Sequence, residues 1–254
     1  MIFDTHAHYD DKAFDEDREA VIDSLIKNGI ETVVNIGADI ASTKTTLALA
    51  AKYPFIYAAV GVHPSSTAEL DEEKLAWLKT VSQEPKVAAI GEIGLDYHWP
   101  EPDHEIQKHW FERQLSLARE VKLPVCIHSR EAAKDTLDMM KEQKAGEIGG
   151  VIHCFSYGTD MAKEYLDMGL FLGVGGVLTF KNPKKLKEVV AYAPIEQLVL
   201  ETDSPYMAPD PNRGKRNTSL NLPYVVKTMA EIKGLRPEEV IEITNRNARR
   251  LYRL

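Results

Sequence analysis

Short apolar runs alternate with longer amphipathic segments along the whole chain. The short runs are rich in β-branched residues, and several are apolar at nearly every position, which is typical of parallel strands covered on both faces. Eight such strands are predicted, at Ile2–Thr5, Thr32–Ile36, Ile56–Val60, Val87–Ile90, Pro124–Ile127, Gly150–Ile152, Leu170–Val174 and Gln197–Glu201.

The longer segments show the spacing of helices. Within Asp17–Asn28, four apolar residues between Val21 and Ile26 fall on one helical face, and Gly29 follows as a residue suited to end a helix. The other predicted helices are Ser42–Lys52, Asp71–Ser82, His104–Val121, Glu131–Lys144, Asp160–Met168, Pro183–Tyr192, Asn221–Lys233 and Pro237–Leu251.

This regular order of strand and helix favours a parallel sheet with crossover helices. The chain has 254 residues, close to the usual size of one TIM barrel, about 250. No linker or low-complexity segment interrupts it, so we expect residues 1–254 to form a single α/β domain, a (β/α)₈ barrel. The alternative is an open doubly wound sheet, but no glycine-rich phosphate loop follows the first strand.

Polar side chains follow most of the predicted strands. His6 and His8 end the first strand, and residues two apart on a strand point to the same face. His63, Glu92, His128, His153 and Asp203 follow the third, fourth, fifth, sixth and eighth strands. A lone His-x-His pair is a weak signal. The joint pattern favours a metal site at the carboxyl ends of the strands over histidines that merely pack in the core.

Imidazole and carboxylate ligands together suit Zn²⁺, Mn²⁺, Fe²⁺ or Ni²⁺, and more weakly Mg²⁺. The set is large enough for two divalent ions, and Glu92 is the natural bridge because its two oxygens can face different ions. Two ions can hold both the attacking and the leaving oxygen of a displacement. Only two carboxylates offset their charge, so we expect the site to attract an anion such as phosphate.

Six segments in order, DTHAHYD, GVHP, GEIGLDYHW, HSREA, HCFS and ETDSPYMAP, span the chain. Together they closely resemble the TatD family of metal-dependent deoxyribonucleases, a branch of the amidohydrolase superfamily. The resemblance implies that Asp203 also orients or deprotonates the attacking water, and it places His63 near the scissile group. The metal ligands that the resemblance implies are His6, His8, Glu92, His128, His153 and Asp203.

Substrate contacts are less well defined. Arg130 is a candidate for phosphate binding, or else a structural ion pair. Tyr97 and Trp99 are candidates for stacking on a base or sugar, or else packing aromatics. A loop after the eighth strand departs from the family pattern, but its basic residues are candidate phosphate contacts, or else a solvated face. The candidates in this loop are Arg213, Lys215, Arg216 and Asn217.

Two further side chains lie beside the expected ligands. Glu201 precedes Asp203 by two residues, so it is expected to share its orientation and to support a ligating histidine. Its alternative role is a buried polar anchor in the barrel. Cys126 and Cys154 are expected to be buried free thiols rather than ligands.

Charge and composition narrow the function. The formal net charge of −8 argues against a broad basic groove for duplex nucleic acid, although bound metal would make the site locally positive. The opening MIFDTHAHYD lacks the pattern of a signal peptide, and no apolar run is long enough to span a bilayer. We therefore expect a cytoplasmic protein that is monomeric and has no membrane or stable protein partner.

The leading hypothesis is metal-dependent hydrolysis of phosphodiesters in single-stranded DNA from an end, because a barrel mouth admits a strand end more easily than a duplex. The preference for DNA and a 3′–5′ direction follow from the resemblance. A second hypothesis keeps the metal site for a carbonyl substrate, such as an aminoacyl-tRNA ester or a small amide or lactone. A third is a structural metal in a non-catalytic barrel. A basic, aromatic-lined mouth would favour nucleic acid, and a narrow apolar pocket a small acyl substrate.

Overall fold

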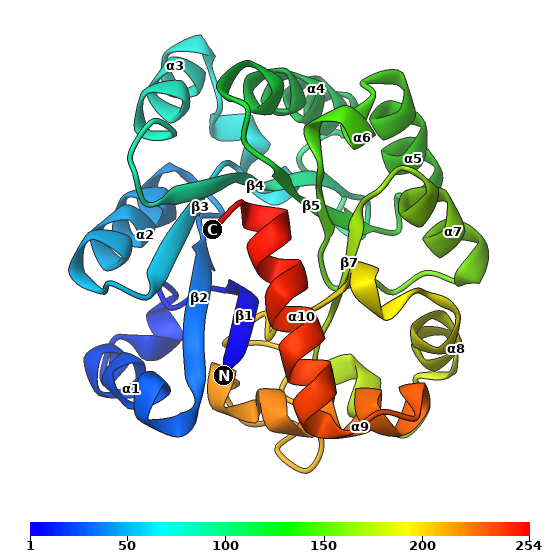
Figure 1. The fold of residues 1–254 in the computed structure, drawn as a ribbon. Helices are drawn as coiled ribbons and strands as arrows, with labels where there is room; N and C mark the ends of the chain where they lie inside the picture. Colours follow the sequence, from blue (N-terminus) through cyan, green and yellow to red (C-terminus); the bar gives the residue numbers. More distant parts are fainter.

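The computed structural model describes all residues from 1 to 254, and its strands form one sheet in sequential order. Each neighbouring pair is parallel, and the backbone of His8 donates to the carbonyl of Ser204, 2.8 Å away, which joins the two ends of the sheet. The prediction of a (β/α)₈ barrel is confirmed (Figure 1). The strands are β1 (Ile2–Ala7), β2 (Ile30–Ile36), β3 (Ile56–Val60), β4 (Val87–Asp96), β5 (Val125–Arg130), β6 (Gly150–Ile152), β7 (Phe171–Val174) and β8 (Leu198–Leu200).

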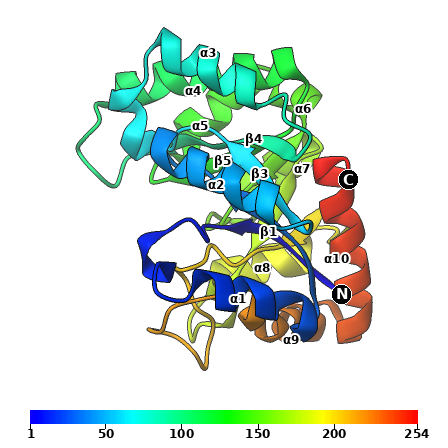
Figure 2. The same ribbon diagram turned by 90° about the vertical axis from the view of Figure 1, so that its left-hand side faces the viewer.

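Helices surround the sheet (Figure 2). They are α1 (Arg18–Leu25), α2 (Ile40–Lys52), α3 (Glu72–Val81), α4 (His104–Val121), α5 (Ala133–Glu142), α6 (Ala145–Ile148), α7 (Thr159–Asp167), α8 (Lys184–Tyr192), α9 (Leu222–Lys233) and α10 (Pro237–Tyr252). Short 3₁₀ segments lie at Lys12–Phe14, Ile26–Asn28, Pro64–Glu69, Gly176–Thr179, Ile195–Gln197 and Ser219–Asn221. No helix is both long and apolar enough to cross a membrane.

The fourth strand differs most from its prediction, since it continues past Ile90 to Asp96. Its second half stays paired with β5 after a bulge between Ile90 and Ile93. Gly94 permits this pairing, because a Cβ there would lie only 1.9 Å from the backbone oxygen of His128. The extended strand brings Glu92 and Asp96 to the same barrel end.

Two apolar cores stabilise the barrel. The larger contains 56 buried residues, mainly between sheet and helices, and the smaller contains 13 residues. The smaller core draws on every strand of the barrel and on α10, which lies across the barrel (Figure 1) and adds Ala248, Leu251 and Tyr252. Its strand residues are Phe3, Val34, Ile36, Ala59, Ala88, Ala89, Cys126, Val151, Phe171 and Val199.

The inward face of the strands changes character along the barrel. The smaller core is called the inner core here, because it draws on the inward face of the strands. On β5, Cys126 belongs to this inner core, and His128 follows it at the next position of the same face. On β8 and beyond, Val199 is followed in the same way by Glu201 and Asp203. Alternation along β5 and β8 therefore places their candidate ligands directly above the inner core, whereas on β1 a register irregularity between Asp4 and Ala7 separates Phe3 of this core from His6.

Helix α10 is anchored to the amino-terminal end of β8 through a buried side chain. The amide of Asn247 donates to the carbonyl oxygens of Ile195 and Leu198, at 2.7 and 2.8 Å. We expect Asn247→Ala to lower the free energy of unfolding by about 1–3 kcal/mol, because both buried acceptors lose their partner. Urea unfolding of metal-free protein, followed by circular dichroism, measures this.

The neighbouring variant Arg246→Ala is the control, since that side chain is exposed and should change stability by less than about 0.5 kcal/mol. Equal unfolding free energies for the two variants would contradict the anchoring role of Asn247.

Candidate metal centre

A cavity of about 1250 Å³ lies at the carboxyl ends of the strands. Its walls come from the loops that follow the strands, and most of the side chains that line it are polar. The lining includes His8, His63, Glu92, His128, His153 and Asp203. The structure therefore brings together the side chains that the sequence predicted as ligands, with His6 fully buried beneath the cavity.

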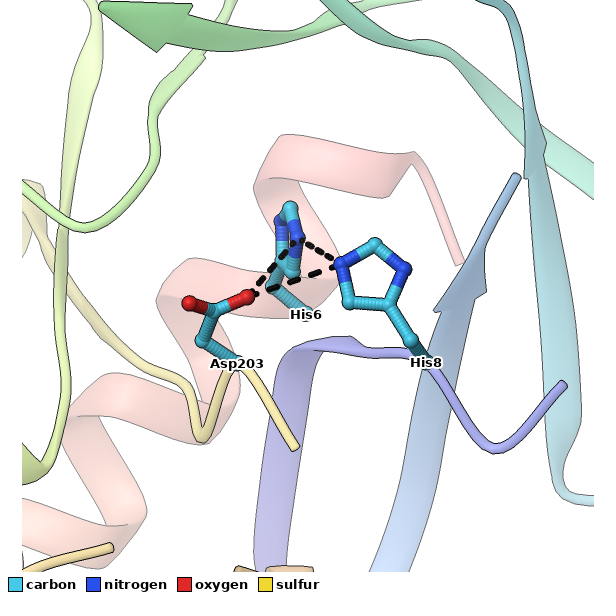
Figure 3. Close-up of side chains that lie close together, drawn as sticks. All are labelled: His6, His8 and Asp203. Atoms are coloured by element: carbon cyan, nitrogen blue, oxygen red, sulfur yellow. Dashed lines mark hydrogen bonds and ion pairs between the residues drawn. The ribbon is translucent and has the colours of Figure 1, made fainter. Parts of the chain in front are cut away.

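The first group of potential ligand atoms centres on β1. Nε2 of His6 lies 3.0 Å from Nε2 of His8, and Oδ1 of Asp203 lies 3.7 and 3.5 Å from these two nitrogens (Figure 3). Oε2 of Glu92 lies 3.5 Å from each nitrogen. Four ligands in a tetrahedron around Zn²⁺ would lie roughly 3.3–3.6 Å from one another. The spacing of this group fits a bound divalent ion.

The hydrogen bonds behind these rings support this fit. Nδ1 of His8 lies 2.9 Å from the carbonyl oxygen of Ile36, which can only accept, so Nδ1 holds a proton and a neutral ring offers the lone pair of Nε2. That lone pair faces the carboxylate oxygens of Glu92 and Asp203. Acceptors that converge in this way repel one another unless a cation or a proton lies among them.

The second group of potential ligand atoms centres on β5 and β6. Oε1 of Glu92 lies 2.8 Å from Nδ1 of His128 and 2.8 Å from Nε2 of His153. These two nitrogens are 3.2 Å apart. The two oxygens of Glu92 thus face different groups, which is the arrangement expected of a bridging carboxylate.

Further carboxylates lie behind the second group. Oδ2 of Asp96 lies 3.2 Å from Nε2 of His128, and Oε1 of Glu201 lies 3.7 Å from Nδ1 of His153. Oε2 of Glu201 is buried without a hydrogen-bond partner. Gly173 makes room for it, because a Cβ at that position would lie 2.1 Å from Oε2. The carboxylates of Asp96 and Glu201 can therefore orient the two histidines.

Asp96 has no role in the sequence prediction. Its position four residues after Glu92 on the same strand is a signal that it shares the inward face, provided that the strand is known to continue beyond Ile90. The structure shows that it does.

Asp4 connects the first and last strands beneath the centre, and it too has no role in the sequence prediction. Its carboxylate accepts hydrogen bonds from the hydroxyls of Thr202 and Ser219, at 2.7 and 2.6 Å, and from the backbone N–H of Thr202, at 3.0 Å. Burial raises the pKa of Asp4 to about 7, against the effect of these donors. These bonds fix the segment that contains Asp203.

The charges of the centre are strongly coupled. Burial opposes ionisation of Glu92, but the surrounding histidines hold its pKa well below the usual value. Burial also disfavours a charged His8, yet Asp203 and Glu92 raise the pKa of this ring to about 9. Without metal, the ionised carboxylates therefore draw protons onto some of the imidazoles, and a metal ion must displace them.

The neutral ring of His63 has the opposite tautomer to that of His8. Its Nδ1 accepts a hydrogen bond from the backbone N–H of Ser65, at 3.1 Å, so the proton of the neutral ring lies on Nε2. Burial and the neighbouring His128 lower the pKa of His63 to about 3. Its Nε2 lies 3.8 Å from Oε1 of Glu92. His63 thus presents a hydrogen-bond donor to the centre.

Among the predicted substrate contacts, Arg130 lines the cavity and Tyr97 does not. The Tyr97 hydroxyl donates to Asp135 at 2.8 Å, and its ring stacks on His104 with the centroids 3.7 Å apart. Of the two roles expected for Tyr97, this arrangement fits packing. Trp99, which is 54% exposed, lines the cavity instead.

None of the four candidates after the eighth strand lines the cavity. Arg216 pairs through both terminal nitrogens with the carboxylate of Asp17, at 2.7 and 2.6 Å. Asn217 is fully buried, and its amide donates to a backbone carbonyl at 2.9 Å. Arg213 packs over an aromatic ring, and Lys215 is exposed. The structure therefore does not bring these four candidates to the cavity, and two of them have structural partners, so their arrangement fits the alternative of a solvated or structural role better than phosphate contact.

Comparisons with known proteins agree with this architecture. The family model described as TatD-related DNase matches residues 3–253. An uncharacterized metal-dependent hydrolase, YabD of Bacillus subtilis, is 44% identical over 254 residues and covers all of both chains. A protein named 3′–5′ ssDNA/RNA exonuclease TatD, from Erwinia tasmaniensis, is 32% identical over 259 residues and also covers both chains fully.

A solved structure gives the same result. The TatD homologue YJJV of Escherichia coli K12 has a TM-score of 0.94 and 30% sequence identity, over 100% of this chain and 98% of that one. The near-complete family match, the full-length relatives and this shared fold show that the chain belongs to the TatD-related DNase family of metal-dependent hydrolases.

Proposed function

We propose that the protein hydrolyses phosphodiester bonds at an end of a single nucleic acid strand, with single-stranded DNA cut in the 3′–5′ direction. The main observation is the pair of acceptor groups joined by Glu92 on the floor of a wide cavity. We propose that this pair holds two divalent ions. The ligands would be His6, His8, Glu92, His128, His153 and Asp203.

The shape of the cavity supports a polymeric substrate. Its volume of about 1250 Å³ exceeds the 300–1000 Å³ or so of ordinary small-molecule pockets, and only 7 of its 26 lining residues are hydrophobic. A narrow apolar pocket for a small acyl group is absent here. The exonuclease name of the Erwinia tasmaniensis relative points to the same substrate class.

Divalent ions in this position would lower the pKa of an attacking water and offset the charge of the scissile phosphate. Asp203 directs Oδ1 toward His6 and His8, which leaves its second oxygen to orient the water and accept its proton. His63 supplies a neutral Nε2–H that can donate to a phosphoryl oxygen. Asp96 lies within hydrogen-bond distance of His128, and Glu201 places a carboxylate 3.7 Å behind His153.

The acidic surroundings make phosphate binding dependent on metal. Asp10, Asp11, Asp15 and Asp39 also line the cavity, and they would repel a phosphate if no cation were present.

We expect metal-stripped protein to leave an end-labelled DNA oligonucleotide intact. Restored Mg²⁺, Mn²⁺ or Zn²⁺ should produce stepwise shortening from the 3′ end, seen as a ladder with a 5′ label on a denaturing gel.

A duplex of the same sequence with blunt ends is the control, and it should be cut more slowly. If none of the three metals supports cleavage of either substrate, the nuclease proposal is wrong. Aminoacyl-tRNA esters and small lactones are then the substrates to test.

Asp203→Asn should lower kcat by at least about 10²-fold, because the amide cannot accept the proton of the attacking water. The rate is measured on the same oligonucleotide at saturating metal, with metal content determined in parallel so that loss of an ion is distinguished from loss of the base. Circular dichroism should be unchanged. Asp160→Asn, on the exposed start of α7, is the matched control. A fully active Asp203→Asn protein would remove this residue from the mechanism.

Glu201→Gln should weaken metal binding by about 10–100-fold, because the charged partner behind His153 is lost while its shape is kept. Isothermal titration of metal-stripped protein with Zn²⁺ or Mn²⁺ measures the change in Kd. The control is Glu196→Gln, an exposed residue outside the cavity. The same Kd in both variants would show that Glu201 is only a polar anchor in the barrel.

A further inference from the structure

Trp99 is an exposed aromatic side chain at the cavity wall, just after β4. More than half of the residue, 54%, is accessible to solvent, although the side chain lines the cavity. An indole face that is exposed at a cavity wall is a good platform for a nucleobase.

The orientation of Trp99 is fixed by its neighbours. The ring of His98 packs against the indole edge to face, with centroids 4.7 Å apart and planes at 82°. Nδ1 of His98 in turn lies 2.7 Å from Oε1 of Glu131. The platform is therefore held by a chain of contacts that reaches from β4 to the end of β5.

Arg130 lies at the end of the adjacent strand. Asp96 and Arg130 are register partners, and the backbone N–H of Tyr97 donates to the carbonyl of Arg130 at 2.9 Å. The Arg130 side chain lines the cavity and has no ion pair or hydrogen bond within the protein, while the adjacent Glu131 is occupied by His98. Arg130 and Trp99 thus both line the cavity on its β4–β5 side, where a free guanidinium can bind a phosphate and an exposed indole can stack on a base.

The rim formed after β1 and β2 is mainly acidic. The segment after β1 contributes Asp10, Asp11 and Asp15, and Asp39 follows β2. Arg18 is bonded to Asp15 and to backbone carbonyls, which leaves the exposed Lys12 as the free cation here against four carboxylates. A strand that enters the cavity would therefore leave it over β4 and β5 rather than over this acidic side.

We propose that Trp99 and Arg130 form the binding subsite for the nucleotide next to the one that is removed. The base of that nucleotide stacks on the indole, and the guanidinium binds its phosphate on the side away from the scissile bond. This inference rests on the proposed nuclease function and assigns the feature that selects a nucleic acid strand over other phosphodiesters. Because every base has a π-face, the subsite should tolerate any sequence.

The test compares Trp99→Ala, Arg130→Ala and the wild-type protein, all loaded with metal, on three substrates. These are a single-stranded DNA oligonucleotide, the same oligonucleotide with an abasic residue next to the terminal nucleotide, and bis(p-nitrophenyl) phosphate. For each variant we expect KM for the intact oligonucleotide to rise about tenfold or more, with kcat within about twofold. KM for bis(p-nitrophenyl) phosphate, which has no second phosphate and no neighbouring nucleotide, should rise much less than KM for the oligonucleotide.

The abasic substrate isolates the stacking contact. With the wild-type protein, KM for the abasic substrate should exceed KM for the intact strand by about the factor that Trp99→Ala causes. With the Trp99→Ala protein, the abasic substrate should not raise KM any further. Trp99→Phe and Arg130→Lys should retain most of the affinity for the intact strand. Tyr192→Ala removes an aromatic residue that is 52% exposed outside the cavity, and it should behave as wild type.

Two results would overturn the subsite in distinguishable ways. Wild-type protein that cleaves neither the oligonucleotide nor the diester would defeat the proposed function and the subsite with it. Wild-type protein that cleaves both, with Trp99→Ala and Arg130→Ala indistinguishable from Tyr192→Ala, would defeat the subsite alone.

Discussion

The alternation of side chains along eight parallel strands determines both the stability and the chemistry of this protein. The face that packs into the inner core at one end of the barrel presents imidazoles and carboxylates at the other. On β5, this face passes from Cys126 to His128 and then to Arg130. A shift of one residue in a strand that carries a ligand would turn that ligand outward and an outward side chain into the core. The register of the strands therefore also determines the geometry of the metal centre.

Buried polar groups around the centre further restrict the orientation and protonation of the ligands that the strand register brings together. Asp4 ties the first strand to the segment that follows the last one, and the carbonyl of Ile36 sets the tautomer of His8. Gly173 leaves the space that Glu201 needs behind His153. Each of these groups lies outside the ligand set, yet each limits the rotation or protonation of a ligand. These groups restrict the positions that the ligands can take, which lowers the cost of ordering them around an ion.

The sequence predicted the architecture and the convergence of the ligand side chains because both follow from local patterns. All eight strands were predicted near their observed positions, and the residues after them meet in one cavity. The sequence did not predict the features that depend on contacts between distant segments. The pairing of Asp96 with Arg130 extends β4, and the partners of Tyr97 and Arg216, Asp135 and Asp17, lie far away in the sequence. The sequence around a basic or aromatic residue near a motif does not show whether a side chain from another segment already binds it.

The position of α10 has a consequence for turnover. Because this helix and the inner core close the amino-terminal end of the barrel, no channel runs along its axis. Whatever enters the cavity and whatever leaves it must use the same opening. For the strand substrate proposed above, the released unit and the remaining strand would have to share this opening, which would favour distributive over processive degradation.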